Sequence, residues 1–558
     1  MKEKEKGRLF ENLPACATEF IKLVIKKMRY RKKVRADVMA ELAAHFEDEL
    51  KDCKTDNEKE QKAQKIIEDF GDVKLLGVLL RRAKKRCRPL WRTVAARTFQ
   101  TIGVLILCFV VYVVWFLTGK PIITTDYVAE LNRIVQPVAD ESLNAAPLYD
   151  EAASELGKKV PEDISKPLGK RYRETTPEEK QLIEKWITDN KKPLELVIIG
   201  SKKPYYWRKY ESDHKDTGEM MVIHLPFLSE FRILAYTLRW RAELRAEQGR
   251  YEDAFDDIKS CYRLGRHLKG DKALVEQLVG MAIEDIATRA IRDILSEHKI
   301  ESTALINLQE DLEQITADED FVVSLKMERL CMYDELQRCF TEDRIGGGHL
   351  YPFRTTGLGG GHQLAKLIVE VILPPERWPG VVHALFLHPN KQQTRKMADR
   401  YYSWMGNIMR KNPAQIRAEG IDIEKETMEI IKGNLLLEFF TPAIGRINEI
   451  SYRNKADVNS TLAIIAILRY KQDKGNFPES LDELITVGYL KELPIDSWSD
   501  KPLIYKRTED NFILYSVSLN FADDGGQVYK DEEGRPRLWN DESGDAVFWP
   551  VQKPEIMQ

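Results

Sequence analysis

The sequence predicts a mainly α-helical protein with a small α+β domain at its C-terminal end and a single transmembrane helix. Three observations support this fold class. Apolar residues recur every three or four positions through much of the chain, which is the helical period. One uncharged apolar segment, 98–119, is long enough to cross a bilayer. Two short strand-like runs, 503–505 and 512–517, follow a helix near the C-terminal end. At 558 residues the chain is too long for one core, so we expect four regions: 1–97, 98–119, 120–450 and 451–558.

The net charge of −3 conceals an uneven distribution of charge. Residues 1–98 contain 26 Lys and Arg against 16 Asp and Glu, whereas the rest of the chain carries 60 against 73. A basic arm of this kind can bind nucleic acid or anionic lipid. Because the densest basic run directly precedes the apolar segment, we expect the lipid bilayer as partner and no nucleic acid. The composition, 43% hydrophobic and 31% charged, is that of a folded protein.

Residues 98–119 form the predicted span. No charged residue lies between Arg97 and Lys120, and a helix of this length reaches about 33 Å, enough for a hydrocarbon core of roughly 30 Å. The alternative is a buried core helix. Eight Lys and Arg and no acid lie in 81–97, whereas Lys120 is the only base before Arg133. The positive-inside bias therefore predicts a cytoplasmic N-terminus and an extracytoplasmic C-terminus, with the span as an uncleaved signal anchor in the inner (cytoplasmic) membrane.

Residues 30–80 are predicted to form short amphipathic helices. Val34, Val38, Leu42, Phe46 and Leu50 recur every four residues in the first. Thr55 and Glu58 have capping-box spacing for the second, and Gly71 is its expected stop. A third helix is expected to begin in the leucine-rich run 75–80.

A family resemblance covers about fifty residues of this region. It rests on Glu41-Leu42, His45, Asp48, Ala63 and Phe70-Gly71-Asp72, which resemble the HAAS-type domain, a small helical module found before membrane spans in bacterial proteins. The resemblance implies a signalling or regulatory association and no chemistry. His45 itself is expected to be a surface or core histidine.

From Asp126 to about Ile450 the chain is predicted to be mostly helical. Thr176-Pro177 is a strong helix start, with a capping residue followed by proline at the first helical position. The best-patterned stretch contains Gly249, Tyr251 and Ala254, a Gly-x-Tyr-x-x-Ala element typical of a helical hairpin of the tetratricopeptide (TPR) type. No second copy lies about 34 residues away, so we expect TPR-like packing and no repeat array.

The last hundred residues change character. A helix within 456–471 ends at Lys474-Gly475, and a short helix follows at 480–485. The order of Tyr470, Gly475, Phe477-Pro478, Leu493-Pro494, Asp496 and Leu514-Tyr515-Ser516 resembles the globular part of type II secretion pseudopilins of the G type, over about ninety residues. A true pseudopilin joins this domain directly to an N-terminal hydrophobic helix. Here the span lies some 340 residues upstream, so we expect the fold without pilus assembly.

The loop 520–526 is the best candidate metal site. Carboxylates on a glycine-bent loop can converge on calcium, which takes six to eight oxygen ligands. The pseudopilin resemblance implies Ca2+ bound by this loop, and the matching positions are Asn520, Asp523, Asp524 and Asp545. The stretch before Asp545 is longer than in the family, and a solvated acidic turn is the alternative.

Two other patterns mark candidate sites. Gly-Gly-Gly-His occurs twice, at 346–349 and 359–362, where His349 and His362, with His383 and His388 nearby, could ligate a metal. Neither phosphate-loop pattern is met, and a flexible loop is the alternative. Aromatic and basic residues are mixed in 202–210, as on a sugar or nucleic-acid platform, and a packing cluster is the alternative. This cluster comprises Lys202, Lys203, Tyr205, Tyr206, Trp207, Arg208 and Tyr210.

No catalytic motif is present: the chain lacks H-E-x-x-H, G-x-S-x-G, C-x-x-C and the kinase set. We therefore expect a membrane-anchored, non-enzymatic sensor or scaffold of a bacterial envelope. It would link a cytoplasmic regulatory module to an extracytoplasmic binding domain, with protein partners on one or both sides. Two alternatives remain: an envelope enzyme, such as a metal-dependent hydrolase with its site in the helical ectodomain, and a secretion or filament-associated component.

Overall fold

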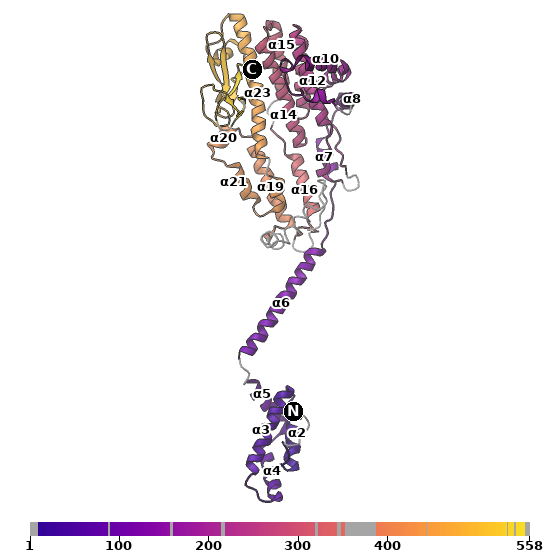
Figure 1. Cartoon of the computed structure of the whole chain (residues 1–558), viewed down its shortest axis with the longest axis vertical. Helices are drawn as coiled ribbons and strands as arrows, with labels where there is room; N and C mark the ends of the chain where they lie inside the picture. The colour runs from indigo at the N-terminus through magenta and orange to yellow at the C-terminus, as the bar shows by residue number, and fades with distance from the viewer. Residues whose placement is uncertain are drawn as a thin grey trace. The chain divides into compact units, whose positions relative to one another are not determined.

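The computed structural model describes residues 9–86, 90–156, 160–213, 218–317, 322–342, 347–351, 387–441, 444–532, 534–540 and 543–552. The described chain is mainly helical, as predicted, and all its strands lie between 495 and 549. It divides into two compact units, Met1–Trp115 and Phe116–Gln558, which are described separately (Figure 1).

The first unit contains a small helical bundle. Its helices are α2 (Ala15–Lys27), α3 (Lys32–Leu50), α4 (Asp56–Phe70) and α5 (Val73–Arg86). The bundle core is apolar and aromatic: Phe20, Phe46 and Phe70 lie with ring centroids about 6 Å apart. Because α2 contacts each of the other three helices, it is the centre of the bundle.

Local signals in the sequence correctly located three of these helices. The predicted capping box is present, since Glu58 N donates to Thr55 Oγ1 and Thr55 N donates to the Glu58 carboxylate. Gly71 ends α4 with φ +67°, a conformation that glycine adopts without strain. The sequence analysis missed α2, and it placed the start of α5 two residues late. His45 is exposed and touches Phe70 edge-on.

Helix α6 (Leu90–Thr118) contains the predicted span. Its segment Val94–Phe116 has a mean hydropathy of 2.3 and is long and apolar enough to cross a membrane. Only 6% of its most apolar window is buried by the rest of the protein, which is not the environment of a core helix. At the far end of α6, Phe116 is buried, and its ring stacks on His349 at 4.8 Å.

The second unit is built mostly from helices. These are α7 (Tyr127–Val135), η1 (Glu141–Leu143), α8 (Ala146–Glu155), α9 (Glu162–Ser165), η2 (Tyr172–Glu174), α10 (Pro177–Asp189), α11 (Lys191–Ser201), η3 (Met220–Val222), α12 (Phe227–Glu247), α13 (Tyr251–His267), α14 (Leu274–Glu297), α15 (Ser302–Thr316), α16 (Lys326–Cys339), α19 (Lys391–Ile408), α20 (Pro413–Ala418), α21 (Ile423–Ile431), α22 (Leu435–Phe440), α23 (Gly445–Lys474) and α24 (Leu481–Val487).

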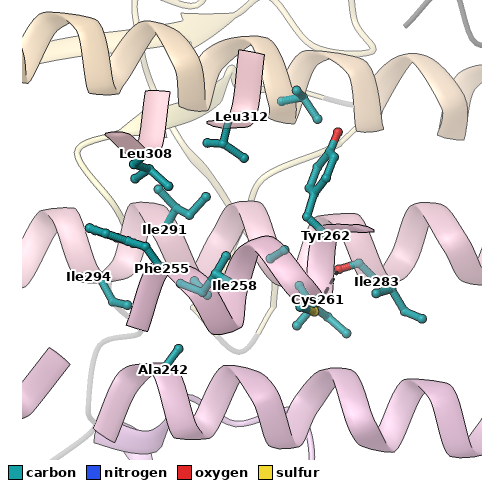
Figure 2. Packing of buried hydrophobic residues seen from close by; sticks show 14 of the residues in the cluster. Ala242, Phe255, Ile258, Cys261, Tyr262, Ile283, Ile291, Ile294, Leu308 and Leu312 are labelled. Carbon is teal, nitrogen blue, oxygen red and sulfur yellow. Dashed lines mark hydrogen bonds between the residues drawn. The ribbon is translucent and has the colours of Figure 1, made fainter. Parts of the chain in front are cut away.

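The largest core of this unit is centred on α13. Figure 2 shows Phe255, Ile258 and Tyr262 of α13 lying among side chains from α12, α14 and α15. The predicted hairpin is present as α12 and α13, and Gly249 turns the chain between them with φ +75°. Cys261 is buried here, and its Sγ lies 3.8 Å from the carbonyl oxygens of Ala235 and Ile283. All the cysteines in the described part of the chain are free thiols.

Helices α13 and α14 approach closely because both carry glycine at the crossing. A Cβ atom on Gly265 would lie 2.6 Å from the carbonyl oxygen of Gly280, which is closer than real Cβ contacts. Lys269 and Glu284 form a buried ion pair of 2.9 Å beside this crossing. The absence of side chains at these two positions therefore determines how near the two helices lie.

The strands follow α24 in the chain. They are β1 (Ile495–Asp496), β2 (Lys501–Pro502), β3 (Ile504–Arg507), β4 (Phe512–Ser516), β5 (Tyr529–Lys530), β6 (Pro536–Arg537) and β7 (Ala546–Trp549). The largest sheet has the antiparallel order β3-β4-β7, with Leu514 opposite both Tyr505 and Trp549. The predicted runs 503–505 and 512–517 correspond to β3 and β4.

Helix α23 joins the strands to the helices. It packs against α14 and α15 and also against β4 and β7 (Figure 1). It ends at Gly475, whose φ is +81°, as the sequence predicted. The predicted boundary between 450 and 451 falls inside α23, and one hydrophobic core includes residues from both sides of it. The division into two domains, 120–450 and 451–558, stays a prediction.

Candidate functional site

A cavity of about 630 Å3 lies at the C-terminal ends of four helices. It is called the cationic cavity below. Its lining comes from the ends of α7, α11, α13 and α15 and from the segments that follow them. The lining residues are Val135, Pro137, Ser201, Lys202, Lys203, Pro204, Tyr205, Tyr206, Arg263, Arg266, His267, Lys269, Lys272, Gln314 and Ile315.

The cavity lining is strongly basic. Six of the lining residues are Lys or Arg, and none of those within the described part of the chain is Asp or Glu. Lys269 is neutralised by Glu284. Four helix C-termini would together offset roughly two further positive charges, at about half a charge each. The ion pair and the helix ends thus offset about three of the six cations, and the carboxylates Asp140, Asp271 and Glu276 lie just outside the lining and act on Lys203 and Lys272.

Two lysines in the lining bond to main-chain carbonyls. Lys203 Nζ donates to the carbonyl oxygen of Ser142 at 2.9 Å, and Lys272 Nζ donates to that of Tyr206 at 2.9 Å. Such bonds hold an ammonium group in place without neutralising its charge, and the nearest carboxylates that act on the two lysines, Asp140, Asp271 and Glu276, do so without an ion pair. Burial lowers the pKa of Lys272, although Glu276 and Asp271 act in the opposite direction. In the described ranges no carboxylate forms an ion pair with Lys202, Lys203, Arg263 or Lys272.

His267 positions the cavity wall as a neutral imidazole. Its Nε2 lies 3.1 Å from the carbonyl oxygen of Lys203, and its Nδ1 lies 2.8 Å from the hydroxyl of Tyr149 on α8. A carbonyl oxygen only accepts, so Nε2 carries the proton and Nδ1 accepts from Tyr149. Burial, together with the smaller effects of Lys272, Arg263 and Arg266, lowers the pKa of His267 to about 4, and the bond to the Lys203 carbonyl oxygen opposes this shift. The ring therefore fixes Lys203 to α13 without adding charge.

The predicted aromatic and basic cluster divides between packing and the cavity. Tyr206 and Tyr210 are buried, and the Tyr210 hydroxyl donates to Glu276 at 2.5 Å. Lys202, Lys203 and Tyr205 line the cationic cavity. Packing therefore accounts for Tyr210, whereas a sugar or nucleic-acid platform stays a prediction.

The part of the cationic cavity that α13 and the segment after it contribute was not predicted from the sequence. Arg263, Arg266 and His267 are spaced three and four residues apart at the end of α13, and Lys269 and Lys272 follow. This spacing puts the side chains on one helix face, and the sequence alone shows that spacing. What the sequence does not contain is the distance between α11 and α13, because that contact is tertiary.

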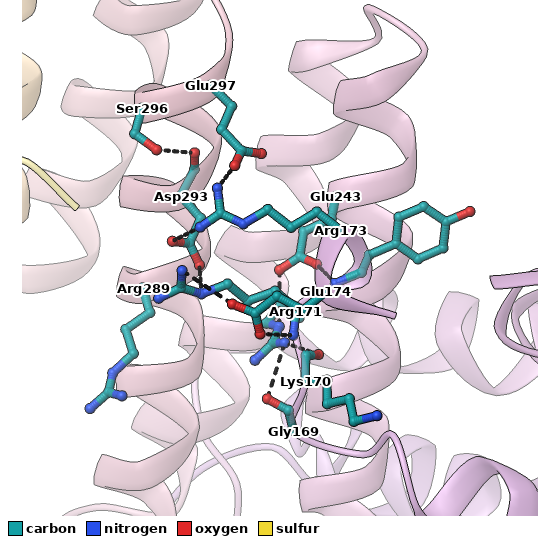
Figure 3. Close-up of polar contacts among 12 residues, drawn as sticks. Gly169, Lys170, Arg171, Arg173, Glu174, Glu243, Arg289, Asp293, Ser296 and Glu297 are labelled. Atoms are coloured by element: carbon teal, nitrogen blue, oxygen red, sulfur yellow. Dashed lines mark hydrogen bonds and ion pairs between the residues drawn. The ribbon is translucent and has the colours of Figure 1, made fainter. Parts of the chain in front are cut away.

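A second charged cluster ties the η2 segment to α12 and α14 (Figure 3). Arg171 Nε lies 3.1 Å from Asp293, and Arg173 pairs with both Asp293 and Glu297. From the other side, Tyr172 N donates to Glu243 at 2.5 Å, and Glu243 pairs with Arg239 at 3.0 Å. Burial raises the pKa of Asp293 and of Glu243, and the nearby arginines oppose that shift.

This cluster borders a cavity of about 370 Å3 that β6 helps to enclose. The cavity has several arginines, but each has a carboxylate within reach. Arg292 pairs with Asp457 at 2.7 Å, Arg289 with Asp285 at 2.8 Å, and both arginines of the β5–β6 segment, Arg535 and Arg537, with Asp531. Balanced charge favours a structural role, which distinguishes this cavity from the cationic one.

The four residues proposed for calcium meet in one loop. Asp524 N and Gly526 N donate to the two oxygens of Asp545, at 3.2 and 2.7 Å. Asp524 Oδ2 accepts from Asn520 Nδ2 at 2.8 Å and from Gly544 N at 2.7 Å. Asp523 Oδ1 accepts from Gly525 N and from the Tyr515 hydroxyl, and these bonds lower the pKa of Asp523. Hydrogen bonds within the protein thus use many of the oxygens that a metal would need.

No group of three or more His, Cys, Asp or Glu in the described ranges is arranged to hold a metal ion. Calcium binding at Asn520, Asp523, Asp524 and Asp545 stays a prediction. Of the histidine candidates, His349 and His388 bond through Nδ1 to main-chain carbonyls and contact Phe116 and Phe340. The second Gly-Gly-Gly-His, with His362, and also His383 lie outside the described residues.

Comparison of the chain with protein-family models, with curated proteins and with solved structures finds no match.

Proposed function

We propose that this chain is a membrane-anchored, non-enzymatic binding protein whose large unit binds a multiply charged anion in the cationic cavity. The observation that carries the proposal is the set of Lys202, Lys203, Arg263 and Lys272, four cations that form no ion pair within 4 Å with a carboxylate among the described residues. The nearby carboxylates Asp140, Asp271 and Glu276 act on Lys203 and Lys272 at longer range only. Like charges held together in one cavity repel one another. An anion that binds between them relieves this repulsion.

The chemistry of the lining favours phosphate or carboxylate groups. Lysine offers three rotatable donors, and arginine offers a planar fork that matches two oxygens of one such group. The volume of about 630 Å3 falls within the range of small-molecule sites, and Tyr205 and Tyr206 add aromatic surface for an organic portion of the ligand. Among the described lining residues none is Asp or Glu, so the cavity offers no paired acid and base there, and binding is better supported than catalysis.

The membrane topology gives this binding a biological context. Helix α6 is long and apolar enough to cross a membrane, and the basic run before it favours a cytoplasmic N-terminus. In this arrangement the chain belongs to the inner membrane, with the cationic cavity outside the cytoplasm and the α2–α5 bundle inside. We propose that the chain is a sensor or scaffold that connects an envelope anion to a cytoplasmic partner, in keeping with the HAAS resemblance of the bundle.

The test is anion binding by the full chain in lipid nanodiscs. We expect pyrophosphate or citrate, each titrated by calorimetry at low salt, to bind, and the affinity to fall as salt is added. The triple variant Lys202→Gln, Lys203→Gln, Arg263→Gln is expected to lose at least tenfold in affinity. Its matched control is Lys191→Gln, which removes a largely exposed cation from the other end of α11.

Two results would count against the proposal. If neither anion binds the wild-type chain, the cavity is not an anion site of this class. If both bind and the triple variant binds as tightly as Lys191→Gln, the anions bind elsewhere on the protein. Thermal unfolding of each variant shows whether the fold is retained.

The two alternatives have less support. A metal-dependent hydrolase would need gathered ligands, and the described ranges contain no group of three or more His, Cys, Asp or Glu arranged to hold a metal ion. A secretion or filament component would need self-association through residues 451–558, where the resemblance to pseudopilins is the only argument. Sedimentation of the full chain in detergent at rising concentration tests that second alternative.

A further inference from the structure

Helix α5 carries an exposed apolar strip that the proposed function does not use. One side of the helix is buried against α2, where a Cβ atom on Gly77 would lie 3.3 Å from the carbonyl oxygen of Val24. The opposite side presents Leu75, Val78 and Leu79, which are 59%, 41% and 50% exposed. An exposed apolar strip of this kind is typical of a surface that binds a membrane or another protein.

Basic residues continue the same strip toward the end of α5. Arg82 and Arg86 follow Leu75, Val78 and Leu79 at helical spacing, so all five lie along one face. Lys74, Arg81 and Lys85 flank that face on one side, and α5 contains no Asp or Glu. An apolar strip with a basic edge is the pattern of a helix that lies in a membrane interface.

The covalent chain places this helix close to the bilayer. Only residues 87–89 separate Arg86, the last residue of α5, from Leu90, the first residue of α6. Even fully extended, that connection spans at most about 14 Å, and one further turn of α6 leads to the candidate span at Val94. If α6 crosses the membrane, the end of α5 must therefore lie near its surface.

We propose that α5 lies on the cytoplasmic surface of the membrane. Leu75, Val78 and Leu79 enter the boundary between headgroups and acyl chains, and Arg82 and Arg86 contact anionic headgroups. Basic segments next to a span are attracted to the negative potential of anionic lipids, which identifies the occupant as an anionic bilayer. This inference is independent of the cationic cavity, which lies in the other unit.

Spin labelling tests the contact directly. The full chain, with its seven cysteines replaced by serine or alanine, receives a nitroxide at Leu79→Cys or, as control, at Glu49→Cys on the exposed face of α3. Nanodiscs of phosphatidylcholine, with or without phosphatidylglycerol, supply the bilayer. We expect the label at 79 to be accessible to oxygen and hidden from a water-soluble nickel reagent when phosphatidylglycerol is present. The label at 49 should stay accessible to nickel in both.

Three results would overturn the proposal. The label at 79 could remain as accessible to nickel as the label at 49, which would mean that α5 faces water. It could show spin–spin broadening, which would mean that a second copy of the chain covers the strip. It could also be equally protected in the variant Arg82→Gln, Arg86→Gln without dependence on phosphatidylglycerol, which would exclude anionic lipid as the occupant.

A second measurement uses the native cysteines, in case their replacement disturbs the fold. In wild-type chain, trypsin should cleave after Arg81 and Arg82 severalfold more slowly in nanodiscs with phosphatidylglycerol than in nanodiscs of phosphatidylcholine alone. Cleavage in the α3–α4 connection at Lys51 and Lys54 provides the internal reference, since that loop is exposed and lies outside the strip. Equal rates at Arg81 and Arg82 in the two lipids would contradict the proposal.

Discussion

Gly265 on α13 and Gly280 on α14 face each other so closely that a Cβ atom on Gly280 would lie 2.5 Å from the carbonyl oxygen of Gly265. The contact is reciprocal, so each glycine is required by the main chain of the other helix. Because α13 also ends at the cationic cavity, this crossing sets the place of Arg263 and His267 relative to the rest of the unit.

We expect Gly265→Ala to destabilise the large unit by about 1 to 2 kcal/mol. Overpacking costs about 1 to 3 kcal/mol, and the greater helix propensity of alanine returns up to about 1 kcal/mol. The measurement is thermal or denaturant unfolding of the full chain in detergent. Gly406→Ala on α19 is the control, because nothing lies within 4 Å of its added Cβ, and it should be neutral or slightly stabilising. Equal behaviour of the two variants would show that the crossing can relax.

His267 predicts a loss of stability in mild acid. Its pKa in the folded protein is about 4, below the ordinary value near 6.5, so the unfolded chain binds more protons between these pH values. The contribution is nearly complete at pH 7 and is lost as the pH falls toward 4, by about 2 kcal/mol between pH 7 and pH 5. We expect the stability advantage of wild type over His267→Gln to shrink by about this amount when unfolding is measured at pH 5 instead of pH 7. An advantage independent of pH would mean that His267 is not neutral.

Arg292 and Asp457 form a buried ion pair between α14 and α23, with 5% and 3% of their side chains exposed. Removing Arg292 leaves the buried Asp457 carboxylate without its ion-pair partner and with only the more distant Arg289 acting on it, so Arg292→Met should cost about 3 kcal/mol in unfolding free energy. The double variant Arg292→Met, Asp457→Leu should recover most of that loss. Arg133→Met, which breaks the exposed Arg133–Glu130 pair, should change stability by at most about 0.5 kcal/mol. If Arg292→Met were equally mild, the pair would be dispensable to the packing of α23.

Asp496 organises the start of the strand region. Its side chain is fully buried, with Oδ1 accepting from Trp498 N and Ser516 Oγ, and Oδ2 accepting from Ser499 Oγ and Val517 N. Asp496→Asn replaces one acceptor with an amide donor that faces donors, and we expect a loss of about 1 to 3 kcal/mol. The exposed Asp510→Asn makes the same chemical change without these partners and should be silent. The measurement is unfolding followed by tryptophan fluorescence, since Trp498 lies beside this carboxylate.

Local signals were enough to predict much of the fold. Thr55 with Glu58, Thr176 with Pro177, Gly249 and Gly475 mark helix ends through contacts within a few residues, and the structure places helix ends at each of them. Helix α2 has Pro14 as its N-cap, without a capping side chain, and it was missed although Ala17, Phe20, Ile21 and Val24 recur at helical spacing. The mainly helical class was therefore predictable, whereas the partners of each helix were not.

The candidate site was only partly predictable for the same reason. Lys202 and Lys203 stood out beside aromatic residues, but Lys272 lies seventy positions away, and nothing local joins the two. The positive charge of the cavity arises from helix ends that meet only in the folded unit. The acidic loop was recognised as a cluster, yet its carboxylates accept bonds from Gly525, Gly526 and Gly544, a use that spacing alone does not reveal.

The β3-β4-β7 sheet has a consequence for the timing of folding. Strand β7 is wholly buried, and Trp549 stacks on Phe512 of β4, some thirty-five residues earlier in the chain. While residues 546–549 are still being synthesised, β4 has an open edge and the core below α23 is uncovered. The β4 edge is therefore closed by a strand of only four residues, and without that strand it would be an unpaired edge of the kind that favours aggregation.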